Sequence, residues 1–376
     1  MRRIVLAYSG ESDASAAVGW LAATYGVEVV AVTLDLGQRI ALEEVRDRAL
    51  AGGAVRAHVL DVRDEFARDF VLPALKADAF DQHGSPTSAE LARPLIGQKL
   101  VELAAIEQAD AIAYGFAGTT SHPSRLDVAA RTLNPSLTIL GPLRDAVRST
   151  AVDFAHSDDL GVVDQEETYR TDVNLWGRVV EWRSADVTWA EPPESIYTLT
   201  RRPADCPDEP AFVELTFEAG MPTAINGVTM PFVELIASLG TIAGAHGVGR
   251  IARVRHSAAG LEWRMVWEAP AAMVLRGAHS ELQQMVTSSE ASRFMRLVRI
   301  EYGDVISRGL WFTSLREALD ACVEKIQQRV SGTIRLRLFK GGCHVVLATA
   351  ESAGKRTVRS STVVRQEMTQ GGGPTI

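Results

Sequence analysis

Short apolar runs alternate with helical patterns along the first 165 residues, and this alternation constrains the fold more than any other feature. It is typical of a parallel sheet with helices on both faces. The run at 29–34 is apolar almost without a break, as expected for a strand buried on both faces. The sequence therefore predicts an α/β domain with strands at 3–8, 29–34, 55–61, 111–116 and 137–141 and helices at 39–52, 63–78, 88–108 and 145–158.

The second half of the chain has a different pattern, in which strand-like and helical segments are mixed. Residues 333–339 alternate apolar and polar side chains, as a strand with one exposed face does, and 314–329 has a helical pattern. We therefore expect a first domain at 1–165 and a second, α+β domain at 166–352. Residues 353–376 are polar and end in glycines, so we predict a flexible tail there.

Composition narrows the class of protein. A chain of 376 residues is long enough for two domains with substantial cores, and its formal net charge of −8 argues against non-specific nucleic-acid binding. Its three cysteines are widely spaced and give no zinc motif or disulfide framework, which fits a reducing compartment. We find no signal peptide and no membrane-spanning run. We expect a cytoplasmic protein whose partners include neither nucleic acid nor membrane.

The turn after the first predicted strand has the composition of an anion-binding site. Residues 8–15 read Tyr-Ser-Gly-Glu-Ser-Asp-Ala-Ser and lead into a helical pattern. Backbone N–H groups at such a turn and at the helix N-terminus point to one place, where the helix dipole favours negative charge. Hydroxyls of Ser9, Ser12 and Ser15 add donors. The alternative is an ordinary βα turn, in which Asp13 only caps the helix.

Two further segments, 35–38 and 114–118, also follow predicted strands. Because ligands of such sheets bind beyond the carboxyl ends of the strands, we expect these segments and the turn at 8–15 to meet at one crevice.

The turn resembles the pyrophosphate loop of the ATP pyrophosphatases, Ser-Gly-Gly-x-Asp-x-Ser, with Glu11 at the second glycine. Along nearly its whole length the chain is similar to the argininosuccinate synthase family. The matching blocks are 7–10, 30–38, 73–77, 91–96, 174–178, 191–194, 246–251, 268–272 and 315–321. The resemblance implies a Rossmann-like (adenine nucleotide alpha hydrolase-like) nucleotide-binding domain followed by a synthetase domain. In the family's reaction ATP adenylates citrulline, pyrophosphate leaves, and the amine of aspartate displaces AMP.

The resemblance also implies ATP with Mg²⁺, small-molecule substrates and a homo-oligomer, either a tetramer or a dimer. The histidines form no metal-ligand cluster, so we expect no separate metal site. The nucleotide would be held by Ala7, Tyr8, Ser9, Gly10, Glu11, Ser12, Asp13, Ser15, Thr33 and Gly115.

Three residues are candidates for a catalytic role. Asp13 would act through Mg²⁺ on the phosphates. Arg93 would reach phosphate or substrate, or else form a structural salt bridge. His122 would be a general base for the attacking amine, a hydrogen-bonding residue of the pocket, or a solvent-exposed loop residue.

The expected substrate pocket departs from the family pattern. Arg125 is retained where the family binds the citrulline carboxylate, but a family Ser is Arg170 and the family Glu that holds the citrulline ammonium is Arg255. Arg beside an ammonium would cost about 4 kcal/mol for two unit charges roughly 4 Å apart, whereas its planar fork fits carboxylate or phosphate. The other substrate positions are Ser85, Glu90, Ala117, Ser121, His122, Val179 and Trp267.

These departures leave two main hypotheses open. In the first, the chain is an AMP-forming ligase with substrates other than citrulline and aspartate, at least one of them anionic. In the second, it is an inactive paralogue that binds a small molecule or a partner, because Glu11 cannot easily adopt a positive φ and repels phosphate, and the family Lys is Thr119. A third class, sulfur-transferring tRNA enzymes, would need catalytic cysteines and a basic surface, and the sequence indicates neither.

Overall fold

The computed structural model describes residues 1–10, 12–81, 84–114, 125–142, 168–183, 191–256, 262–352 and 355–360. The chain divides into two compact units, each assembled from three segments. The first comprises 1–66, 90–165 and 305–316, and the second 67–89, 166–304 and 317–376. Our sequence-based domain boundary at residue 165 stays a prediction, since these units group residues by proximity and not by their ability to fold alone.

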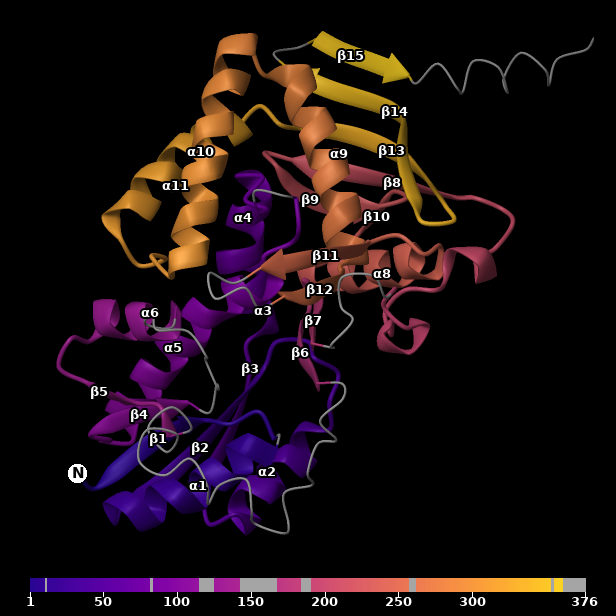
Figure 1. Ribbon diagram of the computed structural model, residues 1–376. Helices are drawn as coiled ribbons and strands as arrows, with labels where there is room; N and C mark the ends of the chain where they lie inside the picture. Colours follow the sequence, from indigo (N-terminus) through magenta and orange to yellow (C-terminus); the bar gives the residue numbers. More distant parts are fainter. Residues whose placement is uncertain are drawn as a thin grey trace, which may run out of the picture. The chain divides into compact units, whose positions relative to one another are not determined.

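The first unit is built on a parallel five-stranded sheet in the order β3-β2-β1-β4-β5 (Figure 1), which confirms the predicted α/β class. Its strands are β1 (Arg3–Ala7), β2 (Glu28–Asp35), β3 (Arg56–Asp61), β4 (Ala111–Tyr114) and β5 (Thr138–Leu140). The helices between them are α1 (Ser12–Tyr25), α2 (Leu42–Ala51), α3 (Arg63–Phe66), α5 (Ser88–Ile106) and α6 (Arg125–Leu133). The helix predicted at 145–158 lies outside the described residues.

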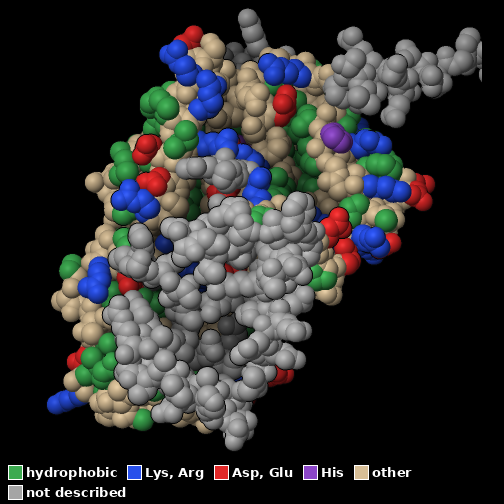
Figure 2. Space-filling view, in the orientation of Figure 1, with side chains coloured by type: hydrophobic (Ala, Val, Ile, Leu, Met, Phe, Trp, Pro, Cys, Tyr) green, Lys and Arg blue, Asp and Glu red, His purple; other side chains and the backbone are tan. Residues whose placement is uncertain are grey.

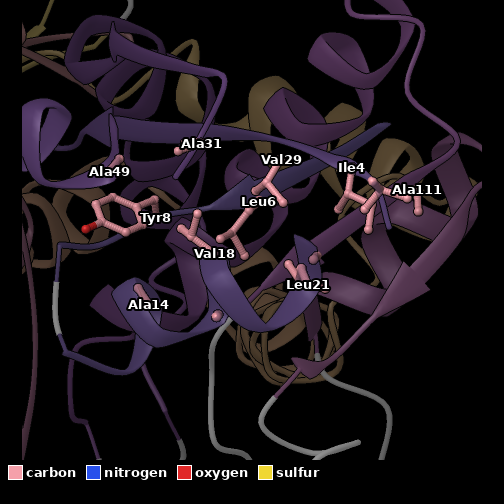
Figure 3. Packing of buried hydrophobic residues seen from close by; sticks show 14 of the residues in the cluster. Ile4, Leu6, Tyr8, Ala14, Val18, Leu21, Val29, Ala31, Ala49 and Ala111 are labelled. Carbon is pink, nitrogen blue, oxygen red and sulfur yellow. The ribbon is translucent and has the colours of Figure 1, made fainter. Parts of the chain in front are cut away.

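The core of this unit lies between the sheet and helix α1 (Figure 3). Ile4 and Leu6 of β1 are fully buried and pack with Val18 and Leu21 of α1. Alternate residues of a strand point to the same face, so these two side chains follow from the apolar run in β1. Val29 of β2 joins the same cluster. This packing fixes the position at which β1 ends and the turn begins.

The helix predicted at 63–78 is broken into three pieces. Helix α3 is followed by a π-helical turn at Ala67–Val71 and by α4 (Leu72–Lys76). Pro73, at the start of α4, has no N–H to continue the helical bonding, which accounts for the break.

The second unit contains two antiparallel sheets, in agreement with the predicted α+β class. The six-stranded sheet has the order β10-β9-β8-β13-β14-β15 and the four-stranded sheet the order β11-β12-β7-β6. The strands are β6 (Thr168–Asn174), β7 (Gly177–Arg183), β8 (Ala211–Glu218), β9 (Met221–Ile225), β10 (Val228–Thr229), β11 (Arg250–His256), β12 (Glu262–Glu268), β13 (Gly332–Phe339), β14 (Gly342–Ser352) and β15 (Lys355–Ser360). The longer helices are α8 (Phe232–Ala245), α9 (Pro270–Val286), α10 (Ser289–Arg308) and α11 (Ser314–Gln327).

The predicted flexible tail, 353–376, begins too early. Residues 355–360 form β15, which pairs with β14 from Ser352↔Lys355 to Leu347↔Ser360. Polar and basic residues suit an edge strand, because its backbone bonds one neighbour while its side chains remain exposed. Residues 361–376 lie outside the described part. Within the described part, no helix has the length and apolar character needed to cross a bilayer.

Candidate functional site

The first candidate site lies at the carboxyl end of β1, in the middle of the parallel sheet. The chain goes from β1 outward through β2 to β3 on one side, and β4 and β5 lie on the other side. The order of strands therefore reverses between β1 and β4, which is the position where sheets of this class bind ligands. The turn at 8–10 leaves β1 at this point and leads into α1.

Glycine is required at position 10 of this turn, because a side chain there would clash with its surroundings. Its φ is +83°, and a Cβ there would lie 2.9 Å from both methyl groups of Val45 in α2. The residue before Ser9 is equally fixed: the N–H of Tyr8 donates to Val32 O at 2.8 Å, and Thr33 Oγ1 donates to Tyr8 O at 2.9 Å. The turn is therefore a rigid piece of backbone between β1 and α1.

Two side chains complete the surroundings of the turn. The hydroxyl of Tyr8, which is 3% exposed, lies 2.7 Å from Ser15 Oγ in the first turns of α1. Arg48 Nη1 of α2 donates to the carbonyl of Gly10 at 2.9 Å. That bond directs the carbonyl of Gly10 toward a cation, so the turn does not present this carbonyl to an anion. Sequence reasoning missed Arg48, because nothing in the sequence distinguishes it from Arg46, the other arginine of its helix.

Of the predicted nucleotide-binding residues, the structure brings six together at this turn: Ala7, Tyr8, Ser9, Gly10, Ser15 and Thr33. For Ser12 and Asp13 only the backbone is described, and it lies in the first turn of α1. Glu11 and Gly115 lie outside the described residues, as do the predicted substrate residues Ala117, Ser121 and His122.

Arg125, which we predicted to bind substrate, lies in the first unit with Glu90. Its Nε donates to Ser307 O at 2.6 Å, and its Nη2 lies 3.9 Å from Glu90 Oε1, with the two side chains 41% and 29% exposed. Glu90 therefore competes with any ligand carboxylate for this guanidinium. Arg93 follows Glu90 by three positions in α5, so the two lie on the same side of the helix.

The carbonyl of Glu90 is also unusual. Pro94 stands four residues later inside α5 and has no N–H to donate to it. Both the carboxylate and the backbone carbonyl of Glu90 can therefore accept hydrogen bonds from donors outside the helix.

The second unit gathers predicted substrate positions on one face of the four-stranded sheet. One cross-strand row is Arg170, Glu181, Met265 and Arg253, and the next is Asp172, Val179, Trp267 and Ile251. Arg255 follows Arg253 by two residues in β11 and so occupies a position on the same face. For Arg170 and Arg255 only the backbone is described. We call this face, defined by these nine positions, the arginine face. Val179 and Trp267 are buried, with 6% and 4% of their surfaces exposed.

The register separates the two predicted pocket arginines of this unit. Arg170 is on edge strand β6 and Arg255 on edge strand β11. Three strand spacings, about 14 Å, lie between those edges. The expected cluster of arginines is thus spread across the face.

Ser85 contacts the arginine face at Arg253, a residue that the sequence analysis did not single out. Arg253 Nε donates to Ser85 Oγ at 3.3 Å, and Ser85 is 1% exposed. The N–H of Ser85 donates to Asp81 Oδ1 at 2.7 Å, which closes the loop after α4. The spacing of Arg253 and Arg255 was the sequence signal for this residue, because residues two positions apart in a strand point to the same face.

That loop is also held from helix α9. Arg276 Nε donates to Asp78 Oδ1 at 2.6 Å, and its guanidinium lies 4.3 Å from the centre of the Phe80 ring. A second arginine, Arg299 of α10, contacts the other oxygen of Asp78 at 3.1 Å. The segment that carries Ser85 is thereby anchored within the second unit at several points.

The opposite face of the four-stranded sheet is organised by a buried carboxylate. Glu268, 1% exposed, accepts backbone N–H groups of Thr198, Leu199 and Thr200 at 3.0, 2.8 and 3.0 Å. It also accepts from Thr200 Oγ1 at 2.8 Å and Arg178 Nη1 at 3.0 Å. A buried carboxylate with so many donors fixes the segment 198–200 against β7 and β12.

Arg250 extends this network toward solvent. It pairs with both oxygens of Glu194 at 2.6 and 2.9 Å, and its guanidinium lies 4.0 Å from the centre of the Tyr197 ring. The hydrogen bonds from Arg250 lower the pKa of Glu194 below its usual value. Four of the sequence blocks that carry the family resemblance thus meet in one polar network, at Arg178, Glu194, Arg250 and Glu268.

Comparison with known proteins covers both halves of the chain. Residues 3–161 match the family described as arginosuccinate synthase N-terminal HUP domain, and residues 169–367 match arginosuccinate synthase C-terminal domain. A protein of Symbiobacterium thermophilum named argininosuccinate synthase is 42% identical over 353 residues, which are 93% of this chain and 88% of that relative. One from a Nostoc species with the same name is 39% identical over 356 residues, covering 94% and 89%.

Proposed function

The chain belongs to the argininosuccinate synthase family of ATP-dependent ligases, and we propose that it joins an acceptor to an amine with release of AMP and pyrophosphate. We further propose that its substrates differ from citrulline and aspartate and that at least one is anionic. The observation that carries this proposal is the arginine face, where Arg170, Arg253 and Arg255 share one side of a sheet with Val179 and Trp267.

Charge on that face supports an anionic ligand. The three arginines stand against two carboxylates, Asp172 and Glu181, which leaves an excess of positive charge. Guanidinium groups bind carboxylate or phosphate in bidentate fashion, and they repel an ammonium. A substrate that carried its cation where citrulline does would meet Arg255 in place of the family's acid.

In the proposed mechanism, the turn at 8–10 and the N-terminus of α1 bind the phosphates of ATP through backbone N–H groups. An oxygen of the acceptor attacks the α-phosphorus, the bond to pyrophosphate breaks, and an acyl-type adenylate forms. The amine nucleophile then attacks the activated carbon, AMP leaves, and the amine loses a proton. His122 is the proposed base for that proton, and Arg93 is proposed to stabilise phosphate or substrate.

Mg²⁺ would accompany the nucleotide. Magnesium in such sites is held by one or two carboxylates together with substrate phosphates, and Asp13 in the first turn of α1 supplies a carboxylate at the required end of the helix. When bound, the ion would neutralise charge on the phosphates.

We also propose that the protein is cytoplasmic, acts on small molecules and forms a homo-oligomer, with neither nucleic acid nor membrane as a partner. The net charge of −8, the three widely spaced cysteines and the bacterial relatives support this setting.

The proposal can be tested by measuring pyrophosphate release from ATP. The assay uses a panel of acids that carry a ureido, amide or carboxylate group, each alone and together with amines. We expect release that depends on one acid and grows with one amine. Formation of argininosuccinate from citrulline and aspartate would instead support the ordinary family reaction, which the identity of about two fifths to the named relatives favours. Silence across the panel, with no ATP binding by calorimetry, would support an inactive paralogue closed by Glu11.

A pair of variants ties the result to the arginine face. Arg255→Glu restores the family's acid and should weaken use of the anionic substrate at least tenfold. Arg329→Glu makes the same change of charge at an exposed position after α11 and should leave kcat/KM within twofold of the parent. Equal effects of the two variants would refute the assignment of the face.

A further inference from the structure

Arg276 of helix α9 contacts the loop after α4, which carries Ser85, at three points. Its Nε donates to Asp78 Oδ1 at 2.6 Å, its Nη1 donates to Gly84 O at 3.4 Å, and its guanidinium lies 4.3 Å from the centre of the Phe80 ring. The first two contacts use different N–H groups, and the third uses the face of the guanidinium plane. An ammonium is a point charge without such a plane, so Lys cannot make all three contacts together.

Asp78 presents its carboxylate from a left-handed backbone position. It lies two residues after α4 with a φ of +51°, which Asp tolerates better than most residues, and its N–H donates to Leu75 O at 3.0 Å. Arg299 of α10 contacts its second oxygen at 3.1 Å. Figure 2 shows Lys and Arg side chains gathered between α9 and α10, with acidic ones beside them. The carboxylate of Asp78 is therefore held from two helices at once.

The ring of Phe80 connects Arg276 to the four-stranded sheet. The centre of this ring lies 6.4 Å from that of Trp176, which is in the turn between β6 and β7, and both residues are buried. A guanidinium at the observed distance is attracted by the negative face of an aromatic ring. Arg276 thus lies against a ring that packs at the end of the sheet with the arginine face.

The contact with Gly84 reaches Ser85 through one peptide unit. The N–H of Gly84 donates to Asp81 O at 2.8 Å, the N–H of Ser85 donates to Asp81 Oδ1 at 2.7 Å, and the N–H of Asp81 donates to Ser85 O at 3.0 Å. These bonds make the end of the loop rigid. A shift of the Gly84 carbonyl away from Arg276 therefore moves Ser85 as well.

Ser85 in turn orients Arg253 on the arginine face. Ser85 is buried, and its Oγ accepts from Arg253 Nε at 3.3 Å. A hydrogen bond at Nε restricts the tilt of the whole guanidinium, because the group is planar. Bidentate binding of a carboxylate or phosphate requires this plane to be aligned with the anion. The position of Ser85 thus affects how well Arg253 binds an anion.

We propose that Arg276 is a positioning residue for the anionic substrate. It fixes the loop that carries Ser85 and, through Ser85, sets the orientation of Arg253 without touching the substrate itself. The proposal rests on the proposed function of the arginine face, and it adds to that function a residue from a helix that is not part of the sheet.

Arg276→Lys tests the proposal in the assay of pyrophosphate release, with the acid that the parent uses. KM for that acid should rise at least tenfold while kcat stays within threefold of the parent, because Lys keeps the charge beside Asp78 and loses the contacts with Gly84 and Phe80. Arg299→Lys is the matched control. In the described part of the chain Arg299 makes a single contact with the same carboxylate, which an ammonium can supply, so KM should stay within twofold. An unchanged KM for Arg276→Lys, or an equal rise for both variants, would overturn the proposal.

A cycle of single and double variants shows whether Arg276 acts through Ser85. Ser85→Ala removes the acceptor of Arg253 Nε, so in this background Arg276→Lys should raise KM less than twofold further. A full second increase would mean that the two residues act independently, and the proposed route would be wrong. If Arg276→Lys does not fold, Phe80→Leu takes its place in the same cycle and should raise KM about threefold, because it removes the ring beneath the guanidinium.

Phosphate binding separates failure of this proposal from failure of the ligase function. Calorimetry with inorganic phosphate compares the parent with Arg253→Ala and Arg276→Lys, and the affinity that Arg253→Ala removes belongs to the arginine face. If the parent releases no pyrophosphate with any acid but both variants weaken phosphate binding at least fivefold, the ligase function fails and the positioning role stands. No phosphate binding by the parent, or equal affinity in the parent and Arg276→Lys, would overturn the positioning role whatever the turnover.

Discussion

Replacing Glu268 by Gln should destabilise the second unit far more than a change of one atom suggests. The carboxylate accepts three backbone N–H groups at 198–200, the hydroxyl of Thr200 and the guanidinium of Arg178. Gln keeps one oxygen and presents an NH₂ group to donors on the other side. Two donors then lose their acceptor at about 1–3 kcal/mol each, so we expect a loss of about 3 kcal/mol.

Glu194→Gln is the matched control for this change. Glu194 also pairs with an arginine through two oxygens, but its side chain is 49% exposed. Exposed ion pairs contribute up to about 1 kcal/mol. Burial and the larger number of donors on Glu268 together separate the two variants by about 2 kcal/mol, which is roughly a 30-fold difference in the unfolding equilibrium.

Urea unfolding followed by tryptophan fluorescence measures both effects, because Trp176 and Trp267 lie in the same unit as Glu268 and are buried. The midpoint should fall clearly for Glu268→Gln and little for Glu194→Gln. If the two variants unfold within about 0.5 kcal/mol of each other, the network does not hold the sheet and the argument from burial is wrong.

Three further predictions concern Gly10, the pair of Glu90 with Arg125, and the pH dependence of Glu194. Gly10→Ala should destabilise the chain by about 2 kcal/mol and abolish ATP binding by calorimetry, because of its positive φ and the valine methyls 2.9 Å from the new Cβ; full ATP binding would contradict this. Glu90→Gln should lower KM for an anionic substrate by no more than about fivefold, since the pair that it forms with Arg125 is partly exposed; a higher KM would mean that Glu90 itself binds substrate. The pKa of Glu194 is lowered from 4.5, so its contribution to stability is present above that pH and is lost as the pH falls below it. Urea midpoints of the parent and Glu194→Gln should therefore converge as the pH falls below about 4.5, and a constant difference would contradict the assignment.

The strands of the first unit were predictable because each is an apolar run between polar segments, as β2 shows. The glycine turn was predictable for a similar reason, since only Gly tolerates the φ of +83° at position 10. What these features share is that local sequence decides them.

The contacts of Arg48 and Arg253 could not be found in this way, although the two-residue spacing of Arg253 and Arg255 predicts that these two share a face of their strand. The partners of Arg48 and Arg253, the carbonyl of Gly10 and the hydroxyl of Ser85, are 38 and 168 residues away in the sequence. Tertiary packing alone brings each guanidinium to its acceptor, and no periodicity of the sequence encodes such a meeting. Strand β15 escaped prediction for the same reason, because its pairing with β14 and not its composition makes it a strand.

Helix α2 touches Gly10 in two ways, with Val45 behind its Cα and Arg48 on its carbonyl. The helix thus holds the turn both by packing against Gly10 and by binding its carbonyl. Substitutions at Val45 or Arg48 would change the conformation of the turn without altering any residue of the turn itself. The proposed affinity for ATP can therefore be adjusted, in evolution or by design, through a helix outside the turn.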